Sequence, residues 1–123
     1  MKLSDQQFEF ARDCVLLELW MINHGYKFTY GEAWWPDEMQ KIYFKKGLSQ
    51  IEGRGPHGNQ LARDYNIWMN GMLTYVKEDL KPIGEFWESL NPLNRWGGKL
   101  IIGYNENNEP KYDTCHFERR KLS

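Results

Sequence analysis

The sequence has little of what would place a protein in an oxidising compartment or on a nucleic acid. Among its 123 residues there are two cysteines, Cys14 and Cys115, a number typical of free thiols in a reducing compartment rather than of a disulfide framework. Sixteen basic residues stand against 17 acidic ones, for a formal net charge of −1, and no long run of one sign occurs. This balance argues against nucleic acid as the main partner.

Long hydrophobic runs are missing too. The most apolar stretch, VLLELWMI, is interrupted by Glu18 and is far too short to span a bilayer, and MKLSDQQ has no apolar segment after its lysine. We therefore expect no signal peptide, no membrane insertion and synthesis in the cytoplasm. We also expect one domain over residues 1–123 and a monomer. A chain of this length buries somewhat more than roughly 60% of the surface that its unfolded form exposes.

Histidine is scarce, and two of the three histidines lie at an informative spacing from aspartates. Six residues separate His57 from Asp64, and two separate Asp113 from His116. Zinc prefers imidazole nitrogen and carboxylate oxygen, and a catalytic zinc has three protein ligands and an open position for water. We predict one Zn²⁺ held by His57, Asp64 and His116, with Asp113 as the general base. The remaining His24 has no companion at ligand spacing, so we expect a structural role for it.

The segments that carry these residues resemble a known family of zinc peptidases. GPHGNQLARDYNIW, EFWESLNPLNRWGG and YDTCHFE are similar to the enzymes that cut bacterial cell-wall peptides. That family includes D-alanyl-D-alanine carboxypeptidases and dipeptidases, and the phage L-alanyl-D-glutamate endopeptidases used as endolysins. Its pattern is S-x-H, a six-residue gap to Asp, and later Asp or Glu three residues before His, which His57, Asp64, Asp113 and His116 match. Upstream, GEAWWPDEMQ resembles G-E-A-x-R-T-P-E-Q, so the likeness covers about residues 30–118.

The resemblance implies a zinc-dependent hydrolysis of an amide in a peptidoglycan stem peptide, by a protein that reaches the cell wall after release. Two departures concern catalysis: Trp35 aligns with an arginine that stabilises the oxyanion, and Gly55 aligns with the serine. Loss of an oxyanion donor typically costs about a hundred- to a thousandfold in rate. The candidates to replace that arginine are Arg54, Arg63 and Arg95. A non-catalytic, zinc-containing cell-wall-binding or virion structural module is therefore the alternative, and which peptide bond is cut stays open.

Further residues are expected around the zinc. We predict that Trp34, Trp35 and Trp96 line the substrate groove, although most aromatic residues of a small domain belong to its core. Glu118 shares a strand face with His116 and is expected to orient a ligand through a hydrogen bond. Cys115 should point the opposite way and belong to the core.

The patterning predicts the α+β class, with about three helices packed on a small, mostly antiparallel sheet. The first helix is expected from about Asp5 to His24, because Ser4 and Gln7 form a capping-box signature and Gly25 follows. The apolar residues of this helix recur at helical spacing: Phe8, Ala11, Val15, Leu19 and Ile22. A second helix is predicted over DEMQKIYFKK, and a third from near Pro82 to before Pro92.

Strands are expected over residues 27–30, 61–69, 100–102 and 112–118. Asn70-Gly71 is the strongest hairpin signal, because both residue types tolerate positive φ. Strand alternation places Asp64 on the face opposite Arg63. Residues three apart in a regular strand face opposite ways, so we predict a bend or bulge at Asp113-Thr114 that allows Asp113 and His116 to converge.

Overall fold

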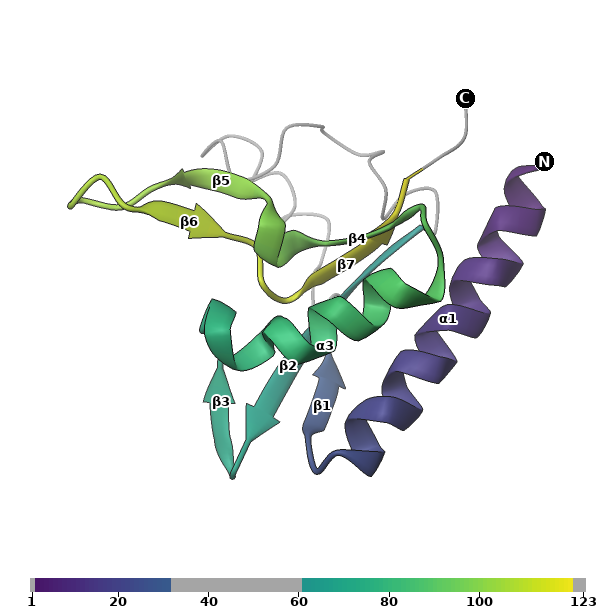
Figure 1. Cartoon of the computed structure of the whole chain (residues 1–123), viewed down its shortest axis with the longest axis horizontal. Helices are drawn as coiled ribbons and strands as arrows, with labels where there is room; N and C mark the ends of the chain where they lie inside the picture. Colours follow the sequence, from purple (N-terminus) through teal and green to yellow (C-terminus); the bar gives the residue numbers. More distant parts are fainter. Residues whose placement is uncertain (1, 32–60, 121–123) are drawn as a thin grey trace.

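Helices cover one face of an antiparallel sheet in this protein (Figure 1). The structure, a computed structural model, describes residues 2–31 and 61–120. Within these ranges the α-helices are α1 (Leu3–Asn23) and α3 (Lys77–Leu90). The predicted mixture of helices and antiparallel strands is confirmed, whereas the helix predicted over DEMQKIYFKK lies outside the described residues. No helix in the described part of the chain combines the length and apolar character needed to cross a membrane.

The main sheet has five strands, in the order β1-β2-β7-β4, with β3 also paired to β2. Residues 67 and 68 of β2 pair with both β1 and β3, so β3 continues along the edge of β2 that β7 occupies. Two further strands form a separate hairpin that projects from the body of the molecule (Figure 1). The strands of the main sheet are β1 (Lys27–Tyr30), β2 (Ala62–Met69), β3 (Met72–Thr74), β4 (Asn94–Trp96) and β7 (His116–Arg119), and those of the hairpin are β5 (Ile101–Tyr104) and β6 (Pro110–Tyr112).

The hairpin predicted at Asn70-Gly71 is confirmed. Asn70 has φ of 53° and Gly71 has φ of 78°, the pair of positive values that a type I′ turn requires. Met69 and Met72 flank the turn as register partners, so β2 and β3 are joined by a two-residue connection.

Helix α1 begins earlier than its capping-box signature predicted, because the cap is formed by other residues. The helix starts at Leu3, and the backbone N–H of Lys2 donates to Asp5 Oδ2 over 3.2 Å. Ser4 therefore lies inside the first turn rather than before it. At the other end the helix stops at Asn23, and Gly25 adopts a φ of +83°.

The face of α1 that packs on the sheet is not the one marked by its most regular apolar pattern. Phe10, Leu17 and Met21 are buried there, together with the polar side chains of Gln6 and Asp13. The residues that predicted the helix lie instead on its outside, where their exposed fractions reach 73% for Phe8 and 50% or more for Val15, Leu19 and Ile22. We call this set the outer stripe: Phe8, Ala11, Val15, Leu19 and Ile22.

Helix α3 also begins before its predicted start at Pro82, which lies inside the helix. The hydroxyl of Thr74 explains the earlier start, since it accepts from the N–H of Val76 over 3.1 Å and donates to Asp79 Oδ2 over 2.8 Å. Acidic side chains in the first turn suit the positive end of the helix dipole.

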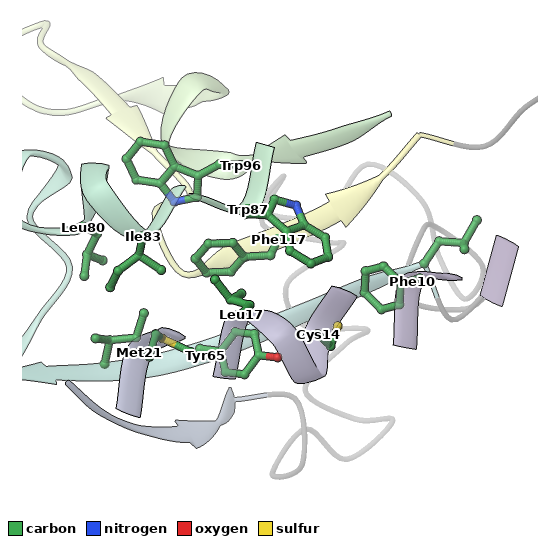
Figure 2. Close-up of a cluster of buried hydrophobic side chains, with 12 residues drawn as sticks. Phe10, Cys14, Leu17, Met21, Tyr65, Leu80, Ile83, Trp87, Trp96 and Phe117 are labelled. Carbon is green, nitrogen blue, oxygen red and sulfur yellow. The ribbon is translucent and has the colours of Figure 1, made fainter. Parts of the chain in front are cut away.

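The core lies between the two helices and the sheet, and aromatic rings dominate it (Figure 2). Phe117 of β7 meets Tyr65 and Trp87 edge to face, with ring centroids 5.6 Å and 6.1 Å apart. Trp96 of β4 is also fully buried, and a Cβ placed on Gly84 or Gly98 would come within 2.3 Å of its indole. The Trp96 indole thus packs β4 against α3, in space that the absence of side chains at Gly84 and Gly98 leaves open.

Candidate functional site

The antiparallel pairing of β2 and β7 brings Asp64 and His116 together. The two residues are register partners, and Asp64 projects from the face opposite Tyr65, which is buried in the core. Asp64 Oδ1 lies 3.1 Å from His116 Nδ1, and both residues are buried. Gly31 provides the space beside the aspartate, because a Cβ there would come 3.2 Å from Asp64 Cβ.

Asp113 reaches the same histidine because the chain turns before β7. The N–H of His116 donates to the carbonyl of Asp113 over 3.1 Å, and the N–H of Asp113 donates to the carbonyl of Gly97 over 3.2 Å. The predicted bend is therefore confirmed, at residues 113–115. It leaves Asp113 Oδ2 3.9 Å from His116 Nδ1.

This turn is held by contacts that sequence patterning did not indicate. The indole N–H of Trp96 donates to the carbonyl of Thr114 over 2.9 Å, and the Thr114 hydroxyl donates to the carbonyl of Tyr75 over 2.7 Å. Gly97 is needed for the close approach, since a Cβ there would lie 2.1 Å from the Asp113 carbonyl oxygen. The glycine pair after Trp96 was the available signal, but it indicated only a turn.

Glu118 contacts the other ring nitrogen of His116, as its place on the same strand face predicted. Its Oε1 lies 2.9 Å from His116 Nε2, and its Oε2 accepts from Arg95 Nη2 over 3.1 Å. Arg95 and Glu118 are register partners across β4 and β7. No sequence pattern indicated this pair, because residues 94–96 were not predicted to form a strand.

The electrostatics of the cluster favour a charged histidine. Burial opposes the charge of His116, but hydrogen bonds to Asp64 and Glu118 outweigh it and raise the pKa to about 10. Burial also opposes the charge of Glu118, yet His116 and Arg95 hold the pKa of this carboxyl below its usual range. A protonated His116 would donate Nδ1–H to Asp64 and Nε2–H to Glu118.

Three arginines were considered as replacements for the oxyanion-stabilising arginine of the similar enzymes. The two that the structure describes, Arg63 and Arg95, both contact carboxylates. The Arg95 guanidinium binds Glu118. The Arg63 guanidinium lies 4.8 Å from the centre of the Tyr30 ring and 3.6 Å from Glu18, on the helical side of the sheet. The other candidate, Arg54, lies outside the described residues, as do both departures from the family pattern.

Three tryptophans were predicted to line a groove, and for Trp96 this prediction is wrong. Its side chain is fully buried in the core, so it cannot contact a substrate. Burial of a large aromatic ring is favourable, and Gly84 and Gly98 leave room for the indole in the core. Trp34 and Trp35 lie outside the described residues.

Cys115 was predicted to point away from His116 into the core, but it is only partly buried and its thiol donates to Asp113 Oδ1 over 3.6 Å, beside the candidate site. Burial together with the charges of Asp64 and Asp113 raises the pKa of this thiol well above its usual range. His24 caps α1, stacks on Trp20 with ring centroids 3.9 Å apart, and its Nδ1 lies 2.7 Å from the Trp20 carbonyl oxygen. His24 thus has the structural role expected for it.

The donor atoms at His116 suit a zinc ion in chemistry, although the set is incomplete in the described residues. Within residues 2–31 and 61–120, no three His, Cys, Asp or Glu side chains are grouped to hold a metal ion. The predicted third ligand, His57, lies outside these ranges. His116 Nδ1 lies 3.1 Å from Asp64 Oδ1, so a cation bound by both groups would take the place of the hydrogen bond between them. Glu118 on Nε2 supplies the carboxylate–histidine contact that is usual for a metal-binding imidazole.

Comparison with known proteins identifies the fold. No family model and no curated protein matches the sequence. Among solved structures, the crystal structure of the Serratia marcescens L-Ala D-Glu endopeptidase ChiX is similar, with a TM-score of 0.53 and 18% sequence identity. The match covers 76% of this chain and 66% of that chain, so this chain spans just under two thirds of its neighbour. Over most of its length the chain therefore has a fold similar to that of an L-Ala D-Glu endopeptidase.

Proposed function

We propose that this protein is a zinc-dependent peptidase that hydrolyses an amide bond in peptidoglycan stem peptides. The observation that carries the proposal is the convergence of three carboxylates, those of Asp64, Asp113 and Glu118, on His116. The likeness in fold to an L-Ala D-Glu endopeptidase supports the substrate class. The proposed bond is either L-Ala–D-Glu or D-Ala–D-Ala, and the proposed setting is that of a phage endolysin acting on the wall after release.

The proposed zinc ligands are His57, Asp64 and His116. When bound, zinc polarises the scissile carbonyl and lowers the pKa of an attacking water to about 7. Asp64 and His116 come from adjacent strands, which hold side-chain direction better than loops do. Glu118 keeps a proton on Nε2 of His116, so that Nδ1 is the nitrogen available to the metal.

Asp113 is the proposed general base. Its side chain is 37% exposed, whereas that of Asp64 is 11% exposed, so a substrate and water can reach Asp113 more readily. Its carboxylate accepts a proton from the attacking water and passes it to the leaving amine. The turn that carries it is fixed by Gly97 and Thr114, so the base needs little rearrangement to act.

Mass spectrometry of purified peptidoglycan fragments, incubated with the zinc-loaded protein, tests the proposal. We expect a new pair of fragments whose masses add up to that of the substrate plus one water, and the individual masses identify the bond that is cut. His116→Ala should abolish the products, and His24→Ala, which removes a histidine from the end of α1, should leave them unchanged. Unaltered fragments at every zinc concentration, with retained sedimentation of protein on cell walls, would replace the peptidase with the non-catalytic binding module.

A further inference from the structure

Strand β2 carries a polar residue beside Asp64 on the same face of the sheet. Side chains two apart in a strand project to the same side, so Asn66 follows Asp64 on the face opposite the helices. Two steps along a strand measure about 7 Å, which is also the length of two residues of an extended peptide. Asn66 therefore lies within reach of a peptide group that is one or two residues from the bond held at the candidate site.

Two hydroxyl groups hold the Asn66 amide from either side. The Tyr75 hydroxyl donates to Asn66 Oδ1 over 3.1 Å, and Asn66 Nδ2 donates to Thr29 Oγ1 over 3.3 Å. Thr29 is the register partner of Asn66 on β1, and Tyr75 directly follows β3, which pairs with the other edge of β2 (Figure 1). We call the side chains of Thr29, Asn66 and Tyr75 the amide row.

The amide row is joined to the turn that carries Asp113. The backbone carbonyl of Tyr75 accepts from the Thr114 hydroxyl over 2.7 Å. Strand β7 pairs with β2 as far as Asp64, and β3 pairs with it from Ile67 onward. The turn therefore lies at the edge of β2 between these two strands, and the amide row lies next to the proposed general base.

The Asn66 side chain can make further hydrogen bonds. An asparagine amide offers two N–H donors and an oxygen with two lone pairs. Among the described residues, its contacts with Tyr75 and Thr29 use one donor and one lone pair. The remaining donor and acceptor match the C=O and N–H groups of one residue in an extended chain, which point to the same side of the backbone. Tyr75 is 51% exposed and Thr29 is exposed, so a peptide can approach the amide between them.

The amide row is uncharged, and this indicates which part of a substrate it contacts. A substrate carboxylate would be bound more strongly by a guanidinium or ammonium group than by neutral amide and hydroxyl groups. The peptide backbone is neutral and presents one donor and one acceptor per residue. The ligand that fits the amide row is therefore the backbone of a peptide, whatever side chains that peptide carries.

We propose that Asn66 binds the backbone of the stem peptide beside the bond that is cut, and that the hydroxyls of Tyr75 and Thr29 fix its amide in the binding orientation. This inference rests on the proposed peptidase function and adds a substrate-binding residue to it. The contact is with a part of the substrate that does not react, so it is equally strong before and during the reaction. It should therefore act on substrate affinity rather than on the chemical step.

Steady-state hydrolysis of a synthetic stem peptide by the zinc-loaded full chain tests the proposal. Asn66→Ala should raise KM by about tenfold and leave kcat within about twofold of the wild type, with unchanged zinc content. Tyr75→Phe should raise KM by about threefold, because it releases the Asn66 amide but keeps the carbonyl that Thr114 contacts. The matched control is Asn23→Ala, which removes an exposed amide at the end of α1 and should behave like the wild type.

A modified substrate tests the contact itself. Methylation of the nitrogen of a peptide group beside the scissile bond removes its N–H, and one methylated peptide is made for each side of that bond. For one of the two peptides, methylation should lower kcat/KM of the wild type about tenfold more than that of Asn66→Ala, because the variant has no contact to lose. A merely structural role of Asn66 would give the same relative loss in both proteins.

The proposal would be overturned by an unchanged KM of Asn66→Ala, by a loss of zinc or of kcat in this variant, or by equal effects of methylation on both proteins. If the wild type cleaves no stem peptide, the proposed function fails, and equilibrium binding of the intact peptide to the zinc-loaded chain tests the amide row alone. Binding that Asn66→Ala weakens by about tenfold would then support the amide row without hydrolysis. Equal affinity of the two proteins, or no binding by the wild type, would overturn it.

Discussion

His116 has a carboxylate on each ring nitrogen, and this determines which role each carboxylate can take. Asp64 faces Nδ1, the position that a metal ion would share, while Glu118 faces Nε2 and is itself bound by Arg95. We therefore propose Glu118 as a positioning residue that orients the ring, whereas Asp113, with a side chain that is 37% exposed, is the most exposed of the three carboxylates.

Replacing Asp113 by asparagine should separate catalysis from metal binding. Asp113→Asn removes the proton acceptor but keeps the size of the side chain, so hydrolysis of stem peptides should fall by about a hundredfold or more. Zinc content and melting temperature should change little, since the proposed ligands remain. Elemental analysis and calorimetry measure these two quantities, and a variant that lost its zinc would show that Asp113 is a ligand rather than a base.

Both thiols should be unreactive in the folded protein. Burial raises the pKa of Cys14 to about 12, and burial with two nearby carboxylates also raises that of Cys115. At about pH 8 both remain protonated, and the thiolate is the reactive form. Labelling with a chromogenic disulfide should therefore be slow in buffer and complete in urea, with the folded-state rate rising as the pH is raised. Rapid labelling of Cys115 in buffer, located by peptide mapping, would show that the turn at residues 113–115 opens.

At the scale of elements, strands were easier to predict than helix faces. The hairpin at Asn70-Gly71 and the bend before His116 follow from local backbone rules, and both are confirmed. The buried face of α1 does not follow from its periodicity, because both sides of the helix carry apolar residues. Tertiary contacts decide which side of the helix is buried. Asp13 is charged and therefore a poor core residue, yet it is buried because its carboxylate forms an ion pair with Arg119 of β7.

Removing the Asp13 carboxylate should destabilise the junction of α1 and β7. The Arg119 side chain is fully buried against Asp13 and Asn94, with Glu9 at the edge. Asp13→Ala leaves this guanidinium without its buried partner and should lower the free energy of unfolding by about 3 kcal/mol.

Chemical denaturation measures this change, and the control is Glu85→Ala, which truncates a carboxylate that is 59% exposed on α3. The double variant Asp13→Leu with Arg119→Met should recover most of the loss, because it removes both buried charges together. An unchanged stability of Asp13→Ala would mean that Glu9 alone suffices to pair the arginine.

The side chains that meet at His116 could be predicted from the sequence, but the residues that hold them in place could not. Asp64, Asp113 and His116 were recognisable by type and spacing, and strand alternation placed Glu118 on the correct face. The Arg95 pair depends on a short strand, β4, that has no alternating pattern of its own. Trp96 was assigned to a groove because its residue type suits both a groove and a core, and the glycines that enclose it come from separate segments.

At the scale of the whole molecule, metal and fold should be coupled. The proposed ligands come from separate segments, and a structural zinc can contribute on the order of 10 kcal/mol to folding. A site that keeps one position for water should contribute less, so zinc should raise the melting temperature and a chelator should lower it.

Scanning calorimetry at matched ionic strength measures the shift. His57→Ala and His116→Ala should remove it, and His24→Ala should not. A binding stoichiometry below about a tenth of a zinc per chain after loading would rule out the proposed site.

Strand β7 has a consequence for mutational tolerance. All four of its residues are buried: His116 and Glu118 on the face of the candidate site, Phe117 and Arg119 on the helical face. Since no position is exposed, this tetrapeptide offers no neutral site to random substitution. In a saturation library, selection for folded protein should deplete substitutions most strongly at positions 117 and 119, and selection for hydrolysis should add 116 and 118. If the substitutions lost only under selection for hydrolysis fall at every second position, the residues needed for catalysis alternate with those needed for folding along the strand.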